Sequence, residues 1–187
     1  ELVGHPPVLI IPNVFEREFC QRLIDLWESG GNVRSGFIRK VSDEGVEMLD
    51  DTIKVRRDHN IQDPVLLKEI ELRFSRRVVP EISKAFNFNI TNLEGIKIGC
   101  YEAETQGHFS AHRDNTTPIT ANRRFAVTLN LNTGEYEGGH LWFPEYGSYL
   151  YRPPVGGAVV FSCSLLHEAT PITEGRRFVF VTFMYGA

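Results

Sequence analysis

The chain has 187 residues, 42% of them hydrophobic and 24% charged, which fits one globular domain with a sizeable core. A net charge of −4 and a pI near 5.9 argue against a general nucleic-acid or anionic-membrane surface, and the apolar runs are too short to span a membrane. The cysteines, an odd number without a C-x-x-C pair, favour reduced thiols and a cytoplasmic location. Because the chain begins at Glu1 rather than Met, we expect a domain cut from a longer protein or a trimmed chain.

The start of the chain predicts a short strand followed by a helix. Pro7–Pro12 is an apolar run between prolines, which is typical of an edge or first strand. Asn13 is expected to be the N-cap of the helix, with Glu16 as its capping-box partner. Apolar residues at helical spacing continue the pattern up to Gly30-Gly31, which is expected to end the helix.

A second helix is predicted to begin after Asp63, with Pro64 in its first turn. Pro80 is expected to kink or restart this helix. Between the two helices, short strand-like pieces flank a charged, glycine-containing loop over Ser42–Asp51. The segment from about Val33 to Asp58 has few apolar anchors, so we expect it to open easily.

After Asn92 the pattern changes to short strands separated by turns that contain Gly, Pro and Asn. Many short strands at regular spacing predict a closed or double-sheet antiparallel architecture. With two helices ahead of them, the expected fold is mainly β with flanking helices (α+β), a jelly roll buttressed by N-terminal helices. We expect a single domain over 1–187, with a helix-containing part, 1–92, and a jelly-roll core, 93–187. The strands are expected at Gly95–Tyr101, His108–His112, Phe125–Leu131, Gly139–Phe143, Ser148–Tyr151, Ala158–Ser162 and Phe178–Tyr185.

One of these strands ends in a motif that is suited to a metal ion. Side chains alternate faces along a strand, so His112 and Asp114 project from the same side. His167, beyond several further strands, can supply a third ligand. Two His and one carboxylate form the facial triad of non-haem Fe(II) oxygenases, which leaves about three of six metal positions free. The alternative is an ordinary strand pair with a hydrogen-bonded histidine, and His108 and His140 are expected to be surface or supporting residues.

Further motifs follow in a fixed order along the chain. Together they resemble the Fe(II)/2-oxoglutarate-dependent dioxygenases, and within them the prolyl-4-hydroxylase-like group, over roughly Val8 to Tyr185. The resemblance implies a double-stranded β-helix, cupin-like core, with His112, Asp114 and His167 as iron ligands and catalytic residues. The motifs that carry it are Cys100-Tyr101-Glu102, His112-Arg113-Asp114, Asn130-Leu131-Asn132, Gly138-Gly139-His140, His167-Glu168-Ala169 and Gly175-Arg176-Arg177.

A cosubstrate such as 2-oxoglutarate chelates the metal at one end and needs a cation for its distal carboxylate, a role that suits arginine. Arg177 shares the inner face of its strand with alternate apolar residues, and the resemblance selects it by its spacing after the distal histidine. Arg176 is the alternative. The resemblance makes Tyr101 a hydrogen-bond partner of the cosubstrate. Asn130 stands where some prolyl hydroxylases have a second tyrosine. We expect it to donate a hydrogen bond in the cosubstrate pocket, and the alternative is that it faces elsewhere.

The resulting hypothesis is an oxygenase that uses Fe(II), 2-oxoglutarate and O₂ to hydroxylate a C–H bond, with succinate and CO₂ as coproducts. Ascorbate is a further candidate cofactor. Expected substrates are a prolyl residue in a protein or peptide, or a small molecule such as a free amino acid, because similarity of fold does not choose among them. Two alternatives are a non-catalytic jelly-roll binding domain and an AlkB-type nucleic-acid demethylase. The complete ligand set argues against the first and the acidic pI against the second.

Overall fold

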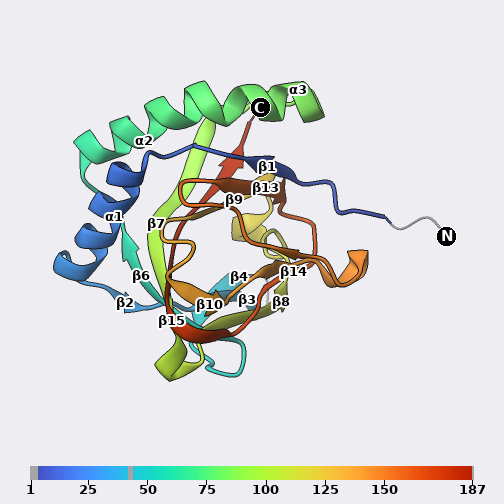
Figure 1. Ribbon diagram of the computed structural model, residues 1–187. Helices are drawn as coiled ribbons and strands as arrows, with labels where there is room; N and C mark the ends of the chain where they lie inside the picture. Colours follow the sequence, from blue (N-terminus) through green and yellow to red (C-terminus); the bar gives the residue numbers. More distant parts are fainter. Residues whose placement is uncertain (1–3, 42–43, 187) are drawn as a thin grey trace.

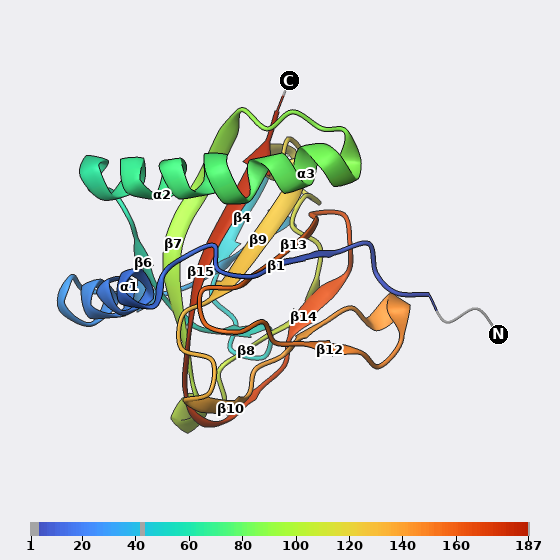
Figure 2. The same ribbon diagram turned by 45° about the horizontal axis from the view of Figure 1, so that its top comes forward.

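The computed structural model describes residues 4–41 and 44–186. Two antiparallel sheets face each other, and helices cover the outer side of the larger sheet (Figures 1 and 2). This arrangement confirms the predicted mainly β jelly roll with flanking helices. The larger sheet follows the order β1 (Leu9–Ile11), β13 (Ala158–Ser162), β9 (Phe125–Asn130), β15 (Ile172–Tyr185), β7 (Asn92–Glu102), β6 (Arg57–Asn60) and β2 (Val33–Arg34), with β10 (Tyr136–Gly138) paired to β15.

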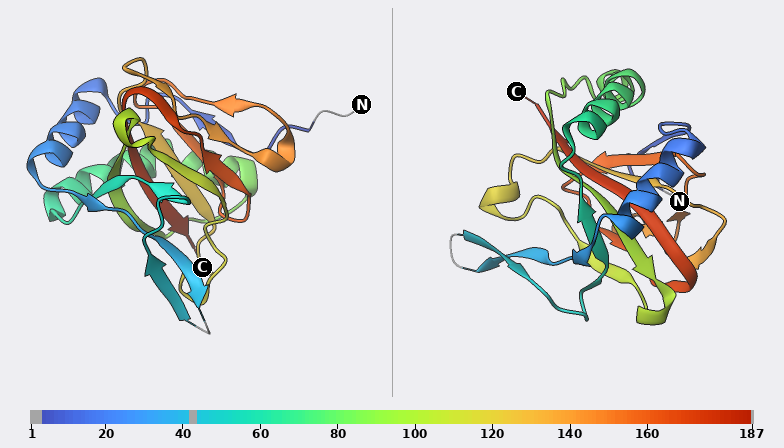
Figure 3. Two further views of the ribbon diagram at one scale, coloured as in Figure 1. Left: turned by 90° about the horizontal axis from the view of Figure 1, so that it is seen from below. Right: turned by 90° about the vertical axis from the view of Figure 1, so that its left-hand side faces the viewer.

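The smaller sheet lies on the other side of the barrel. A separate two-stranded hairpin projects from the body of the molecule, as both views of Figure 3 show. The smaller sheet follows the order β12 (Leu150–Tyr151), β11 (Leu141–Trp142), β14 (His167–Ala169), β8 (His108–His112) and β5 (Lys54–Val55), and the hairpin pairs β3 (Phe37–Val41) with β4 (Glu44–Met48).

The first helix, α1 (Arg17–Ser29), does not begin as the sequence predicts. The N-cap residue is Glu16, without a side-chain cap hydrogen bond, and Asn13 lies in the turn before it with φ of 54°. The prediction of an Asn13 cap was therefore wrong. Asparagine tolerates this left-handed conformation, and the Glu16 carboxylate pairs instead with Arg73 and Arg77, at 2.8 and 2.6 Å.

The second predicted helix is two helices that meet at Val78: α2 (Pro64–Arg77) and α3 (Val79–Phe86). The Asp63 Oδ1 accepts a hydrogen bond from the Leu66 N–H at 2.7 Å, which confirms the predicted cap. Pro80 occupies the first turn of α3, so the predicted restart is also confirmed.

The main hydrophobic core lies between the helices and the larger sheet. The ring of Phe180 on β15 packs against those of Phe15 and Phe74, with centroids 5.1 and 5.6 Å apart. The residues of β15 alternate, so that Phe180 faces the helices while Val179 and Val181 face the space between the sheets. This alternation places Arg177 on the inner face.

Five strands were not predicted: β2, β4, β6, β10 and β14. The strands β6, β10 and β14 are short and rich in polar residues, and pairing with a neighbouring strand stabilises them where hydrophobic alternation is missing. The predicted loop over Ser42–Asp51 is partly wrong, because Glu44–Met48 forms β4. Ser42 and Asp43 lie outside the described residues.

Within the described ranges, no helix is long and apolar enough to cross a membrane. Cys20, Cys100 and Cys163 are free thiols and are buried. The cytoplasmic location stays a prediction. The N-terminal part and the core share one sheet, since β1 pairs with β13 and β6 with β7.

Candidate metal centre

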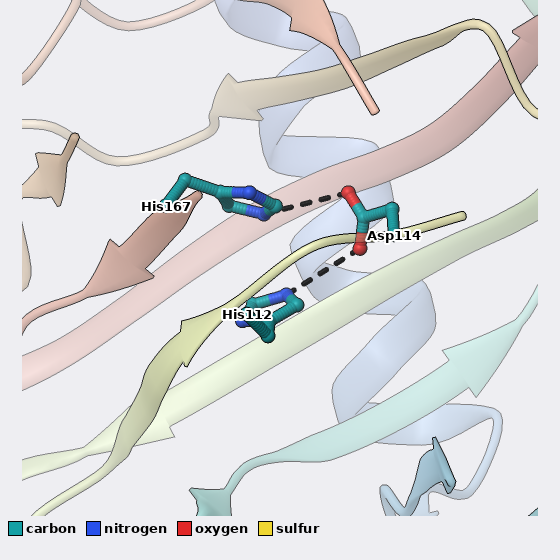
Figure 4. Close-up of side chains that lie close together, drawn as sticks. All are labelled: His112, Asp114 and His167. Carbon is teal, nitrogen blue, oxygen red and sulfur yellow. Dashed lines mark ion pairs between the residues drawn. The ribbon is translucent and has the colours of Figure 1, made fainter. Parts of the chain in front are cut away.

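The structure brings the three predicted ligands together on the inner face of the smaller sheet (Figure 4). His112 ends β8 and is directly opposite His167 on β14 in the strand register. Asp114 follows two residues later, held by a hydrogen bond from its N–H to the Cys163 carbonyl at 2.9 Å. Its two carboxylate oxygens lie 3.4 Å from the Nε2 atoms of His112 and His167, and all three ligand atoms lie within 4.8 Å of one another.

Both imidazoles are oriented by contacts on the side away from the centre. The His112 Nδ1 lies 2.8 Å from the Ser110 carbonyl, and the His167 Nδ1 lies 3.0 Å from the Leu165 carbonyl. A carbonyl oxygen can only accept, so each Nδ1 carries the hydrogen and each Nε2 presents a lone pair to the centre. Such outer contacts fix the ring orientation of a metal ligand and raise its basicity.

The electrostatics of the centre also suit a cation. Burial lowers the pKa of His167 to about 4, so its imidazole is neutral and ready to ligate at pH 7. Burial would raise the pKa of Asp114, but the neighbouring His167 and His112 outweigh it and lower that pKa to about 2. A carboxylate and two imidazoles, all pointing at one position, fit Fe(II) and leave part of its coordination shell open.

The centre opens into a large cavity of about 760 Å³ between the two sheets. Its wall includes the three ligands and two of the predicted cosubstrate residues, Tyr101 and Arg177. The hairpin β3–β4 and the loop around the short helix at Pro118–Thr120 form the other side. The cavity is therefore large enough for a cosubstrate and part of a substrate together.

Arg177 is a buried cation that reaches this cavity. Its side chain is 3% exposed, and its Nη2 donates to the Asn130 Oδ1 at 3.0 Å. Its Nε has no hydrogen-bond partner among the described residues. A Cβ on Gly139 would lie 2.9 Å from the Arg177 Cδ, so a glycine at that position leaves room for the side chain. A buried donor without a partner indicates a missing anionic ligand.

Arg176 takes the opposite face of β15. It is exposed and pairs with Glu28 on α1 at 2.7 Å, with its guanidinium over the ring of Phe178. The alternative assignment of Arg176 as the cation for the cosubstrate therefore has no support in the structure.

Asn130 does not line the cavity but lies behind Arg177. Besides accepting from Arg177, it donates through Nδ2 to the Tyr136 hydroxyl at 3.0 Å and to the Pro153 carbonyl at 3.3 Å. Both N–H groups of its amide and one lone pair of its Oδ1 are used within the protein. The geometry therefore makes Asn130 a residue that positions the guanidinium.

A buried ion pair beside Tyr101 was not predicted from the sequence. Arg56 lines the cavity. It donates two hydrogen bonds to Asp58, at 2.6 and 2.7 Å, and a third to the Tyr101 hydroxyl at 3.1 Å. A Cβ on Gly99 would lie 2.9 Å from Arg56, so this glycine also leaves necessary space. Lys54, Arg56 and Asp58 are spaced two residues apart in the sequence, and this spacing is a weak signal that their side chains share one side of the chain.

Comparisons with known proteins agree with this geometry. Residues 96–185 match the model of the 2OG-Fe(II) oxygenase superfamily. The chain is 35% identical over 86 residues to a PKHD-type hydroxylase of Saccharophagus degradans, a match that covers 42% of this chain. The match covers 37% of that relative's length.

Two solved structures share the fold. A prolyl hydroxylase from Trichoplax adhaerens, in complex with a peptide fragment of the hypoxia inducible factor oxygen degradation domain, has a TM-score of 0.71 and 20% identity, and the match covers 96% of this chain and 83% of that one. The viral collagen prolyl hydroxylase of Paramecium bursaria Chlorella virus-1, as a 2OG complex, has a TM-score of 0.71 and 13% identity, and the match covers 100% of both chains. At such identities the likeness extends to the fold alone.

Proposed function

We propose that the chain is an Fe(II)- and 2-oxoglutarate-dependent dioxygenase, because residues 96–185 match the model of the 2OG-Fe(II) oxygenase superfamily. The reaction is hydroxylation of a C–H bond, with succinate and CO₂ as coproducts. One observation carries this proposal: the three ligands share a cavity wall with a buried arginine whose Nε has no hydrogen-bond partner in the described part of the chain. The substrate in this proposal is a prolyl residue in a protein or peptide, or a small molecule.

His112 and His167 would hold Fe(II) through their Nε2 atoms and Asp114 through a carboxylate oxygen. Iron held there supplies the activation of O₂, a reaction that protein side chains do not perform. The protein's part is to keep one side of the coordination shell open and to line the cavity around it.

Arg177 binds the distal carboxylate of 2-oxoglutarate in this proposal. Its Nε is free to donate, and Asn130 holds the rest of the guanidinium in place. The Tyr101 hydroxyl accepts a hydrogen bond from Arg56, so its own hydrogen is free to bond a cosubstrate carboxylate. The cosubstrate is thus held by donors that the fold has already oriented.

The test of this function is product formation. The protein is incubated with Fe(II), 2-oxoglutarate and a fractionated cell extract, and succinate and hydroxylated products are followed by mass spectrometry. We expect succinate and a product one oxygen atom heavier than its precursor, and neither when Zn(II) replaces Fe(II). Succinate formation that is the same with the two metals would overturn the proposal. Turnover with and without ascorbate tests the prediction that ascorbate is a further cofactor.

A further inference from the structure

The cavity is markedly cationic, and most of its cations already have an acidic partner. Eight Lys and Arg side chains line it against three carboxylates. The pairs are Arg56 with Asp58, Lys97 with Asp58, Arg123 with Glu94, Arg113 with Glu145 and Arg34 with Asp51. Two buried cations, Lys54 and Arg177, stand outside this set of pairs. The proposed function accounts for Arg177, which leaves Lys54 to be explained.

Lys54 is held inside the cavity rather than at its rim. Its side chain is 6% exposed, on β5 at the edge of the smaller sheet. Its Nζ donates to the Gly36 carbonyl at 2.6 Å and lies 4.7 Å from the centroid of the Phe109 ring. That ring stacks on His112, with centroids 3.5 Å apart and planes 17° apart. One aromatic ring therefore separates the ammonium group from a metal ligand.

The contacts of Lys54 within the protein do not balance its charge. An ammonium group has three donors, and the residues that the structure describes give this one a single acceptor, which is neutral. Burial, reinforced by Arg56, lowers its pKa well below the usual value. Asp58 is shared with Arg56 and Lys97, and a cation bound at the metal centre would take up the charge of Asp114. Burying such a group is costly unless an anion compensates it.

The cosubstrate does not supply that anion in the proposed arrangement. One carboxylate of 2-oxoglutarate lies on the metal and the other on Arg177, on the opposite sheet from Lys54. The anion that compensates Lys54 therefore belongs to the molecule that occupies the rest of the cavity, beside Phe109 and the base of the hairpin.

We propose that Lys54 is a binding residue for a carboxylate group on the substrate, so that this protein acts on an anionic substrate, either a free acid or an acidic peptide. This inference deepens the proposed function and rests on it, because it assigns the cosubstrate to Arg177. The carboxylate lies close to the metal centre, which places the reacting C–H bond only a short distance from the acid group.

The test uses acetate as the carboxylate probe and the resonances of Lys54 as the readout. Protein labelled with ¹³C at its lysine side chains is loaded with Zn(II), which does not turn over, and with 2-oxoglutarate. The Lys54→Met variant identifies the Lys54 signal by its loss, and its thermal melting shows whether it folds. Lys84, exposed on α3 and paired with Glu81, is a control lysine in the same spectrum.

We expect acetate to shift the Lys54 signal in a saturable way, acetamide to leave it unchanged, and the Lys84 signal to show no saturable shift. A Lys54 shift no larger than that of Lys84 would overturn the proposal. The titration is repeated without 2-oxoglutarate, and a shift that appears only in its absence would also overturn the proposal, because Lys54 would then serve the cosubstrate. Binding of Zn(II) and 2-oxoglutarate is measured first by calorimetry. Its failure would count against the proposed function, while the acetate titration of the metal-free protein would still test Lys54.

Discussion

Arg177 and Asn130 face each other from neighbouring strands, and the guanidinium Nη2 donates to the amide Oδ1 at 3.0 Å. The other end of the amide is anchored by the Tyr136 hydroxyl and the Pro153 carbonyl. The arginine is therefore fixed on one side and free on the other, at Nε. A cation that is fixed before its ligand arrives loses less conformational entropy on binding.

Arg177→Ala is expected to weaken 2-oxoglutarate binding by about 1.5–3 kcal/mol, as for the loss of hydrogen bonds to a charged group. Calorimetry on the Mn(II)-loaded protein measures this loss. Arg176→Ala is the matched control and should cost much less, since its partner is the exposed Glu28. The reverse order of the two losses would mean that the cosubstrate lies on the other face of β15.

Asn130→Ala removes a residue that positions Arg177, so its effect on 2-oxoglutarate affinity should be smaller. The expected loss is about 0.5–1.5 kcal/mol, the usual net value of one hydrogen bond. In the double variant with Arg177→Ala, this loss should disappear, because the two residues act through one contact. Additive losses in the double variant would show that Asn130 binds the cosubstrate by itself.

The contrast between Arg177 and Arg56 shows what the sequence could predict. Arg177 lies on a long strand with clear hydrophobic alternation, so its face followed from periodicity. Arg56 lies between two short polar strands, β5 and β6, whose pairing depends on distant partners on β8 and β7. The periodicity of a short segment does not reveal a pairing partner that is distant in the sequence. For the same reason β14, which carries His167, was not predicted as a strand.

His167→Ala is expected to abolish Fe(II) binding or turnover, because each of the three ligands supplies one bond to the metal. Equilibrium dialysis with Fe(II) under anaerobic conditions measures the affinity. His140→Ala is the control, since this histidine lies outside the group of three. Full retention of iron affinity by the His167 variant would contradict the assignment of the metal centre.

The buried pair of Arg56 and Asp58 should make stability depend on pH in the acid range. Burial would raise the pKa of Asp58, but Arg56 outweighs it and lowers that pKa below its usual value of 3.8. A carboxylate whose pKa is lowered by folding contributes stability that is present above its unfolded pKa and lost as pH falls toward the folded one.

Asp58→Asn should therefore destabilise the protein by about 3–5 kcal/mol near pH 7, as expected when one partner of a buried pair is removed. Urea unfolding at several pH values measures the difference between variant and wild type, which should shrink below pH of about 4. Asp25→Asn, at an exposed position on α1, is the control. A difference that does not change with pH would contradict the role given to the charge of Asp58.

The last prediction concerns the hairpin β3–β4, which forms part of the cavity wall but pairs with no other strand among the described residues. It touches the loop at Pro118–Thr120 mainly where Gly45 approaches Ile119, so little surface holds it down. Closure of the hairpin over a bound substrate would exclude water from the metal centre.

Trypsin cleavage after the exposed Arg39 should therefore slow several-fold when the metal, a 2-oxoglutarate analogue and substrate are all bound. Lys54 is buried on β5, so it is not expected to be a cleavage site despite lying in the same segment. Cleavage at Lys84, on α3, provides the control because that helix lies away from the cavity. If cleavage after Arg39 proceeds equally fast with and without substrate, the hairpin is a surface feature that takes no part in closing the active site.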